Sequence, residues 1–167
     1  MSELAEQLAR EFSDKEYAHA YMEEHANMAL AAQIKTLREN LDMTQTELAE
    51  LAKMKQERIS ALENVEYNAW TVKTLRKLAK AFDVHLKVSF VPFSKGILDV
   101  VNLSREQLSI PAREDDLAKF RNCYLVHRDR TWKVLDASHL AAVTNLPSSA
   151  PVEPRSTWQR FNMVVNG

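Results

Sequence analysis

Residues 45–63 read QTELAELAKMKQERISALE and predict two short helices joined by a sharp turn. Leu48 and Ala49 give the first helix a small apolar face, and Ala49 leaves room for a second helix to cross closely. Ile59 and Leu62 lie three residues apart and give the second helix an apolar stripe. We therefore predict a helix-turn-helix, in which the first helix supports the second.

Capping boxes and apolar periodicity predict the helices around this segment. The box Thr44-Gln45-Thr46-Glu47 starts the first short helix, because its threonine and glutamate side chains satisfy each other's backbone N–H groups. A second box begins at Ser13, and Thr71 is expected to cap the last helix. The expected helices cover residues 13–28, 29–41, 44–52, 55–64 and 71–82. Five helices in about 70 residues predict a mainly α fold built around a compact domain.

A strand pattern follows the last of these helices. The apolar residues that alternate with polar ones over residues 84–91 are Val84, Leu86, Val88 and Phe90. A lone strand leaves its backbone groups unpaired, so we expect it to pair antiparallel with the same strand of a second copy about a two-fold axis. These four residues are then the expected dimerisation contacts. A hairpin with residues 123–135 of the same chain is the alternative.

We divide the chain into four parts on these patterns. The parts are an acidic helical extension (1–27), a helix-turn-helix DNA-binding domain (28–83), the dimerisation strand (84–91) and a C-terminal extension (92–167). The extensions are expected to be poorly ordered. Within the last part we expect a short helix capped by Ser104, a polar break over residues 111–116, a hairpin over residues 123–135 and a disordered tail over residues 147–157.

Composition points to a soluble cytoplasmic protein without enzymatic activity. The 167 residues include one cysteine, Cys123, which excludes an internal disulfide and a cysteine zinc site. The five histidines have no metal-binding spacing and no glycine-rich phosphate loop is present, so we expect neither a metal nor a cofactor. The N-terminus is too charged for a signal peptide, and no apolar run reaches the roughly 18 residues that would span a membrane.

Charge is distributed unevenly along the chain, although its net charge is only −1. Residues 1–25 carry −5, residues 26–83 carry +1 and residues 84–167 carry +3. We expect the acidic arm to stay away from DNA and the middle of the chain to focus its positive charge on one face.

The second short helix is expected to read double-stranded DNA in the major groove. With Ile59 and Leu62 facing inward, the side chains expected to meet base edges are Gln56, Glu57, Ser60 and Ala61. Those expected to meet the phosphate backbone are Gln45, Lys55, Arg58, Asn68, Thr71 and Lys73. A purely structural alternative has Glu57 paired with Lys53, and Arg58 bridging Glu50 or Glu63.

Four blocks of the sequence, in order, resemble the Cro and phage-repressor type of helix-turn-helix protein, also called the xenobiotic-response-element (XRE) family. The blocks are QIKTLR (33–38), TQTELA (44–49), QERISALEN (56–64) and TLRKLAKAFDV (74–84), and the similarity covers about residues 28–90. The resemblance implies a five-helix, lambda-repressor-like domain that binds a palindromic operator as a dimer. It implies a phosphate contact at Gln45 and DNA contacts at Lys55, Gln56, Glu57, Ser60 and Ala61. Lys53 departs from the family, which usually has glycine in this turn.

Two regulatory roles remain open at this point. The first is a transcriptional repressor located at the nucleoid. The alternative is an antitoxin that binds a toxin through the N-terminal arm or the C-terminal region and represses its own operon. A protein-interaction module that has lost DNA binding is a third hypothesis, supported only by the near-neutral charge. A self-cleaving repressor is rejected, because the chain has no Ala-Gly or Cys-Gly scissile pair.

Overall fold

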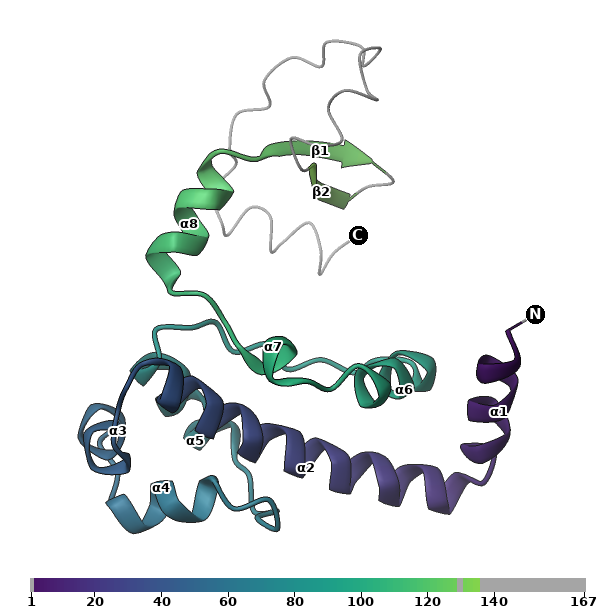
Figure 1. Ribbon diagram of the computed structural model, residues 1–167, viewed down its shortest axis with the longest axis horizontal. Coiled ribbons are helices and arrows are strands. Elements are labelled where there is room, and N and C mark those ends of the chain that lie inside the picture. Colours follow the sequence, from purple (N-terminus) through teal and green to yellow (C-terminus); the bar gives the residue numbers. More distant parts are fainter. Residues whose placement is uncertain (1, 129–130, 136–167) are drawn as a thin grey trace, which may run out of the picture. The chain divides into compact units, whose positions relative to one another are not determined.

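The computed structural model describes residues 2–128 and 131–135 (Figure 1). The chain divides into two compact units, Met1–Ala118 and Lys119–Gly167. The helices are α1 (Glu3–Glu11), α2 (Lys15–Asn40), α3 (Gln45–Ala52), α4 (Gln56–Leu62), α5 (Val72–Ala81), α6 (Phe93–Val101), α7 (Arg105–Leu108) and α8 (Arg113–Arg121). The strands are β1 (Tyr124–Arg128) and β2 (Thr131–Leu135). The predicted mainly α class is therefore confirmed.

Helix α2 is one continuous helix where two had been predicted. The boundary predicted between residues 28 and 29 lies in an alanine-rich run without glycine or proline, so nothing interrupts the backbone hydrogen bonds. The predicted capping box at Ser13 is also wrong. Asp14 is the N-cap, and its carboxylate accepts from the backbone N–H of Tyr17 at 2.7 Å. The Ser13 hydroxyl instead donates to the carbonyl of Arg10 at the end of α1.

The capping predictions for α3 and α5 are confirmed. The Thr44 hydroxyl accepts from the backbone N–H of Glu47 at 3.2 Å, and the Glu47 carboxylate accepts from the backbone N–H of Thr44 at 2.6 Å. The Thr71 hydroxyl accepts from the backbone N–H of Thr74 at 3.1 Å. These caps fix where each helix begins, because the first backbone N–H groups of a helix have no partner within the helix.

Three helices of the domain have a non-glycine residue in the left-handed conformation at or directly after their C-terminal cap. Lys53 closes α3 with φ 52° and ψ 54°, and Asp42 and Asp83 follow α2 and α5 with φ 52° and 54°. Lys53 therefore adopts in this turn a conformation that glycine adopts without strain. Lysine and aspartate are strained in this conformation because the Cβ atom crowds the backbone.

The core of the first unit lies between the C-terminal half of α2 and helices α3 to α5. Leu48, Ile59 and Leu62 are fully buried at its centre. The other members of the buried cluster are Ile34, Leu37, Ala49, Ala52, Leu78 and Phe82. The apolar spacing thus identified the buried residues Leu48, Ala49, Ile59 and Leu62 of α3 and α4 correctly, and burial of these side chains holds the short helices together.

The strand predicted over residues 84–91 is not formed in the single chain. Residues 84–92 connect α5 to α6 without a β-ladder, because a strand requires a neighbouring backbone and none of the residues that the structure describes provides one there. Val84 packs against the domain core, and Leu86 is half-buried. Val88 is exposed, and Phe90 is fully exposed. Of the four alternating apolar residues, the first two are therefore partly buried and the last two are exposed.

Helices α6 and α7 lie beside α2 (Figure 1). Helix α6 had not been predicted, whereas α7 has the predicted cap, in which the Ser104 hydroxyl accepts from the backbone N–H of Gln107 at 3.3 Å. The break predicted over residues 111–116 is wrong from residue 113 onward, where α8 begins. None of α1, α6, α7 and α8 buries a residue fully.

The second unit contains the predicted hairpin. Strands β1 and β2 pair antiparallel with Tyr124 opposite Leu135 and Arg128 opposite Thr131. The hairpin prediction is confirmed, and the alternative pairing of residues 84–91 with residues 123–135 is wrong. The tail predicted over residues 147–157 lies outside the described residues. Within the part of the chain that the structure describes, no helix is long and apolar enough to cross a membrane.

Candidate nucleic-acid interface

The turn between α3 and α4 brings the first residues of both helices together. Backbone N–H groups of Lys53 and Met54 close α3 by donating to carbonyls of its last turn. Lys55 is the N-cap of α4, and Gln56 is its first residue. Gln56 thereby comes within hydrogen-bond distance of Gln45, the first residue of α3. Two helix N-termini, each with unpaired backbone N–H groups, meet on the same part of the surface.

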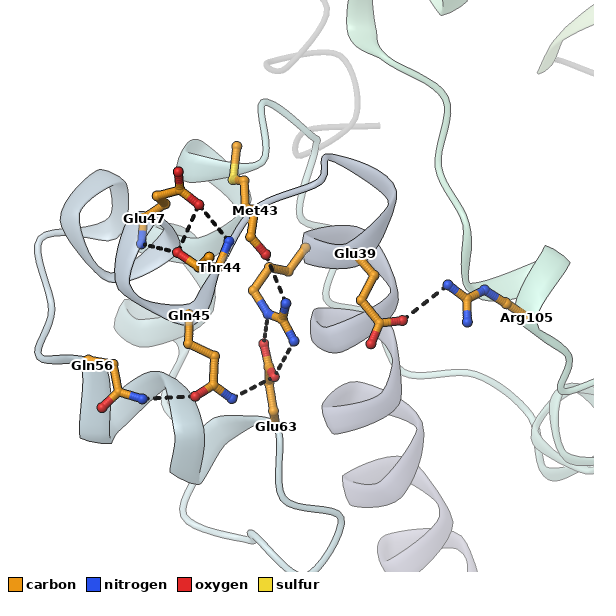
Figure 2. Close-up of polar contacts among 9 residues, drawn as sticks. Glu39, Met43, Thr44, Gln45, Glu47, Gln56, Glu63 and Arg105 are labelled. Carbon is orange, nitrogen blue, oxygen red and sulfur yellow. Dashed lines mark hydrogen bonds and ion pairs between the residues drawn. The ribbon is translucent and has the colours of Figure 1, made fainter.

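A chain of hydrogen bonds fixes the orientation of both glutamine amides (Figure 2). The carboxylate of Glu63 only accepts hydrogen bonds, so the amide nitrogen of Gln45 must face it, at 3.0 Å. The carbonyl oxygen of Gln45 then faces Gln56, whose Nε2 donates to it at 2.8 Å. The Gln56 amide therefore keeps one N–H and its carbonyl oxygen available for another partner.

A bidentate ion pair holds Glu63 in place beneath the glutamines. Arg38 Nε donates to Oε1 of Glu63 at 2.6 Å, and Nη2 donates to Oε2 at 2.9 Å. Its Nη1 also donates to the carbonyl of Met43 at 2.8 Å, which ties α2 to the loop before α3. The two charged side chains are 14% and 5% exposed. Such a buried, planar pair constrains geometry strongly, because both charges depend on each other for solvation.

Opposing effects act on the ionisation of this pair. Burial raises the pKa of Glu63. Hydrogen bonds from Arg38 and Gln45 and the positive charges of Arg38 and Lys35 lower it by a larger amount. The pKa of Glu63 therefore lies below its usual value. The hydrogen bond to Glu63 raises the pKa of Arg38. Glu63 therefore remains an ionised acceptor at neutral pH, which the amide orientation requires.

The outward face of α4 carries most of the residues predicted to read bases. Gln56, Glu57 and Ser60 are exposed, and Ala61 is half-buried at the edge of this face. Lys55 is exposed beside them at the N-cap. Ile59 and Leu62 were predicted to face inward, and both are fully buried. The structure thus brings one cation and three polar side chains to one exposed helix surface.

Arg58, a predicted phosphate ligand, is half-buried and contacts an aromatic ring of the domain. Its guanidinium carbon lies 5.0 Å from the ring centre of Tyr67, a cation–π arrangement. Tyr67 packs edge-on against Trp70 with ring centres 4.9 Å apart, and its hydroxyl donates to the carbonyl of Ala69. Neither Glu50 nor Glu63 forms the predicted bridge, since Glu63 is paired with Arg38. Arg58 therefore anchors the loop after α4.

The remaining predicted phosphate ligands lie around the start of α5. Asn68, Thr71 and Lys73 are all exposed. The hydroxyl of Thr71 is occupied by its capping bond and by a 2.9 Å contact with the Thr74 hydroxyl. Gln45 is half-buried in the network described above.

Sequence reasoning missed the roles of Arg38, Glu63 and Tyr67, because each contacts a residue that is distant in the sequence or lies in an irregular loop.

The comparison with protein families agrees with this geometry. Residues 34–88, about a third of the chain, match the family described as helix-turn-helix. The match confirms the resemblance to the Cro and phage-repressor type, the XRE family, and supports a DNA-binding transcription regulator. No curated protein and no solved structure matches this chain. The residues outside 34–88 therefore have only their own structure to indicate a role.

Proposed function

We propose that this protein is a sequence-specific repressor that binds a palindromic operator as a homodimer and inserts α4 into the major groove. The observation that carries the proposal is the fixed amide of Gln56 at the exposed N-terminal turn of α4. Recognition helices contact bases mainly through their N-terminal residues. A side chain that is already oriented loses less conformational freedom on binding than a free one.

Gln56 and Glu57 are the proposed base readers. The free N–H and carbonyl oxygen of the Gln56 amide match N7 and N6 of adenine, the usual bidentate partner of glutamine. Glu57 is the next residue, is exposed, and can accept a hydrogen bond from N4 of cytosine. Ser60 and Ala61 follow one turn later, where a hydroxyl and a methyl group can contact further bases.

The phosphate backbone is proposed to be held by residues that flank α4. Lys55 precedes the helix, while Asn68, Thr71 and Lys73 surround the start of α5. Gln45 contributes through its place at the N-terminus of α3, where backbone N–H groups favour an anion. Arg58 acts indirectly in this account, by holding the loop that carries Asn68.

Dimerisation is proposed to occur through residues 84–91. Val88 and Phe90 are exposed apolar side chains in a segment that has no β-partner among the described residues 2–128 and 131–135. Antiparallel pairing with a second copy would cover them and form the missing ladder. Two α4 helices related by a two-fold axis read two half-sites, and bound protein then blocks transcription at the operator. This role places the protein at the nucleoid.

Selection of bound fragments from the source genome, with the purified full chain, tests the proposal. We expect a small set of fragments that share a palindromic motif. The substitution Gln56→Ala is expected to reduce affinity for this motif by about 1–3 kcal/mol and to relax preference at one base position in each half-site. Affinity can be measured by fluorescence anisotropy at a fixed salt concentration, because phosphate contacts make binding depend on salt.

The matched control is Gln7→Ala, which removes an exposed glutamine from α1. Operator affinity of this variant should equal that of the unmodified protein. Retention of both affinity and base preference in Gln56→Ala would contradict the contact assignment. Failure to select any fragment at low salt would contradict the proposal as a whole.

An antitoxin role is the second candidate, and the surface of the N-terminal extension favours it. Leu4, Tyr17 and Tyr21 are exposed apolar or aromatic side chains on α1 and the start of α2. Tyr17 and Tyr21 form an aromatic cluster with Phe12, which offers a surface for a protein partner. Expression of the adjacent gene without this chain tests the role. Growth arrest that co-expression relieves would support it, and normal growth would exclude that gene product as a toxin.

A further inference from the structure

A pocket lies between the N-terminal half of α2 and α6 with the residues that flank it. Its volume is about 430 Å³, within the range of roughly 300–1,000 Å³ in which proteins bind small molecules. Figure 1 shows α6 beside this part of α2. The ring of His19 on α2 packs edge-on against Phe93 of α6, with ring centres 5.1 Å apart, which joins the two walls. The pocket lies outside residues 34–88, the part that matches the helix-turn-helix family.

Most of the pocket wall is apolar. Met22 and Ala26 contribute from α2, and Phe93 and Leu103 contribute from the other side. Phe93 remains 44% exposed, so an aromatic ring faces space that no other described residue fills. Gly96 contributes no side chain to the wall. The shape and lining suit an apolar group of moderate size, such as a substituted benzene ring.

The polar residues that line the pocket are one carboxylate and two histidines, His19 and His25. Asp99 is the one carboxylate among the residues that line it. Asp99 lies 3.5 Å from Lys95, and both side chains are 62% exposed, so this ion pair is weak. Glu16 and Glu23 on the same part of α2 are exposed, as is Lys15, and residues 1–25 carry a net charge of −5. A positively charged ligand matches this distribution, and the face of an aromatic ring also attracts a cation.

We propose that this pocket binds a small lipophilic cation, an amine that carries an aromatic or branched apolar group. The apolar part occupies the space between Met22, Phe93 and Leu103, and the ammonium group lies near Asp99. The proposal does not depend on DNA binding. Helix α2 continues from the pocket wall to Arg38, which pairs with Glu63 beneath the DNA-reading face. The pocket and that face are therefore connected by one helix.

Three compounds with the same apolar body test the proposal by calorimetric titration of the full chain. They are 4-phenylbutylamine, 4-phenylbutan-1-ol and 4-phenylbutanoate, which are cationic, neutral and anionic at pH 7. We expect the amine to bind roughly threefold to tenfold more tightly than the alcohol, and the carboxylate to bind most weakly. Equal affinities, tighter binding of the carboxylate, or absence of binding by the amine at millimolar concentration would overturn the proposal.

Three variants locate the binding. Asp99→Asn should abolish the preference for the amine over the alcohol, whereas Asp115→Asn, on exposed α8, should retain it. Gly96→Leu should prevent binding, because a Cβ atom there lies 3.4 Å from the Met22 sulfur, in ordinary contact, and the remaining side chain occupies the pocket. A melting curve monitors folding of each variant. Unchanged amine binding in a folded Gly96→Leu, or an unchanged preference in Asp99→Asn, would overturn the assignment.

Discussion

The helix-turn-helix domain and the helices that follow it are held together by different forces. Leu48, Ile59 and Leu62 are fully buried in the domain, whereas α6, α7 and α8 bury no side chain fully. The polar contacts that attach the later helices are mostly exposed, for example the bond from Arg113 to Asp83 at 2.7 Å and that from Asn40 to Ser109 at 3.0 Å. Apolar burial therefore defines the DNA-reading domain, and weaker contacts position its surroundings.

The largest expected difference between these regions is the effect of removing an apolar side chain. Leu62→Ala should lower the free energy of unfolding by about 2–5 kcal/mol, because it leaves a cavity in a packed core. Leu98→Ala in α6, where the leucine is 56% exposed, should cost less than about 1 kcal/mol. Urea denaturation followed by circular dichroism measures both values. Similar losses for the two variants would show that α6 belongs to the same core.

Ion pairs provide the second comparison. Arg38→Ala should cost about 3 kcal/mol of unfolding free energy, because it leaves a buried carboxylate without its cation. Arg105→Ala removes a pair with Glu39 in which the side chains are 67% and 35% exposed, and it should cost less than about 1 kcal/mol. Figure 2 shows both contacts.

The effect of Arg38→Ala should also depend on pH. The pKa of Glu63 in the folded chain lies below its usual 4.5, so its contribution to stability is fully present above that pH and is lost as the pH falls through the lowered pKa. The difference in stability between Arg38→Ala and the unmodified protein should therefore shrink on acidification below 4.5. A difference that stays constant into this acidic range would contradict the role of the ionised pair.

The segment after α5 offers a third test, which concerns assembly. Val88→Asp should raise the dissociation constant of the dimer about tenfold or more, because a two-fold axis brings two like charges into an apolar contact. Val88→Thr keeps the branched shape without a charge and should remain closer to the unmodified protein. Analytical sedimentation measures both. A fully dimeric Val88→Asp would show that residues 84–91 do not form the interface.

The smallest expected effect concerns the turn between α3 and α4. Lys53→Gly should raise the free energy of unfolding by about 0.5–1 kcal/mol, because glycine adopts a positive φ without steric strain. Lys53→Ala keeps the Cβ atom and should give no such gain. Thermal melts compare the two variants. Equal stability of glycine and alanine at this position would mean that the left-handed turn is not strained.

The sequence predicted local features of the domain well because they depend on neighbouring residues. The Thr44 and Thr71 caps and the inward stripe of Ile59 and Leu62 follow from spacings of three or four residues. Ser13 and Asp14 are adjacent residues that can both cap a helix, and only the hydrogen bond of the Asp14 carboxylate shows that Asp14 caps α2.

Features that join distant residues were not predictable from spacing. The pair of Arg38 and Glu63 connects positions 25 residues apart, and it controls the orientation of Gln56. Helix α8 was missed because its charged sequence has no apolar stripe, and α6 was missed because Pro92 reads equally as the end of a strand. The alternating residues 84–91 read as a strand although the described part of the chain supplies no partner.

One measurement tests most directly whether α4 reads DNA. Backbone amide shifts of the isotopically labelled full chain can be followed by NMR during titration with a selected operator duplex. We expect the largest shifts at Gln56, Glu57 and Ser60, with smaller shifts near Asn68 and Lys73 and little change in α6. Shifts concentrated in α1 and α6, with α4 unaffected, would contradict it.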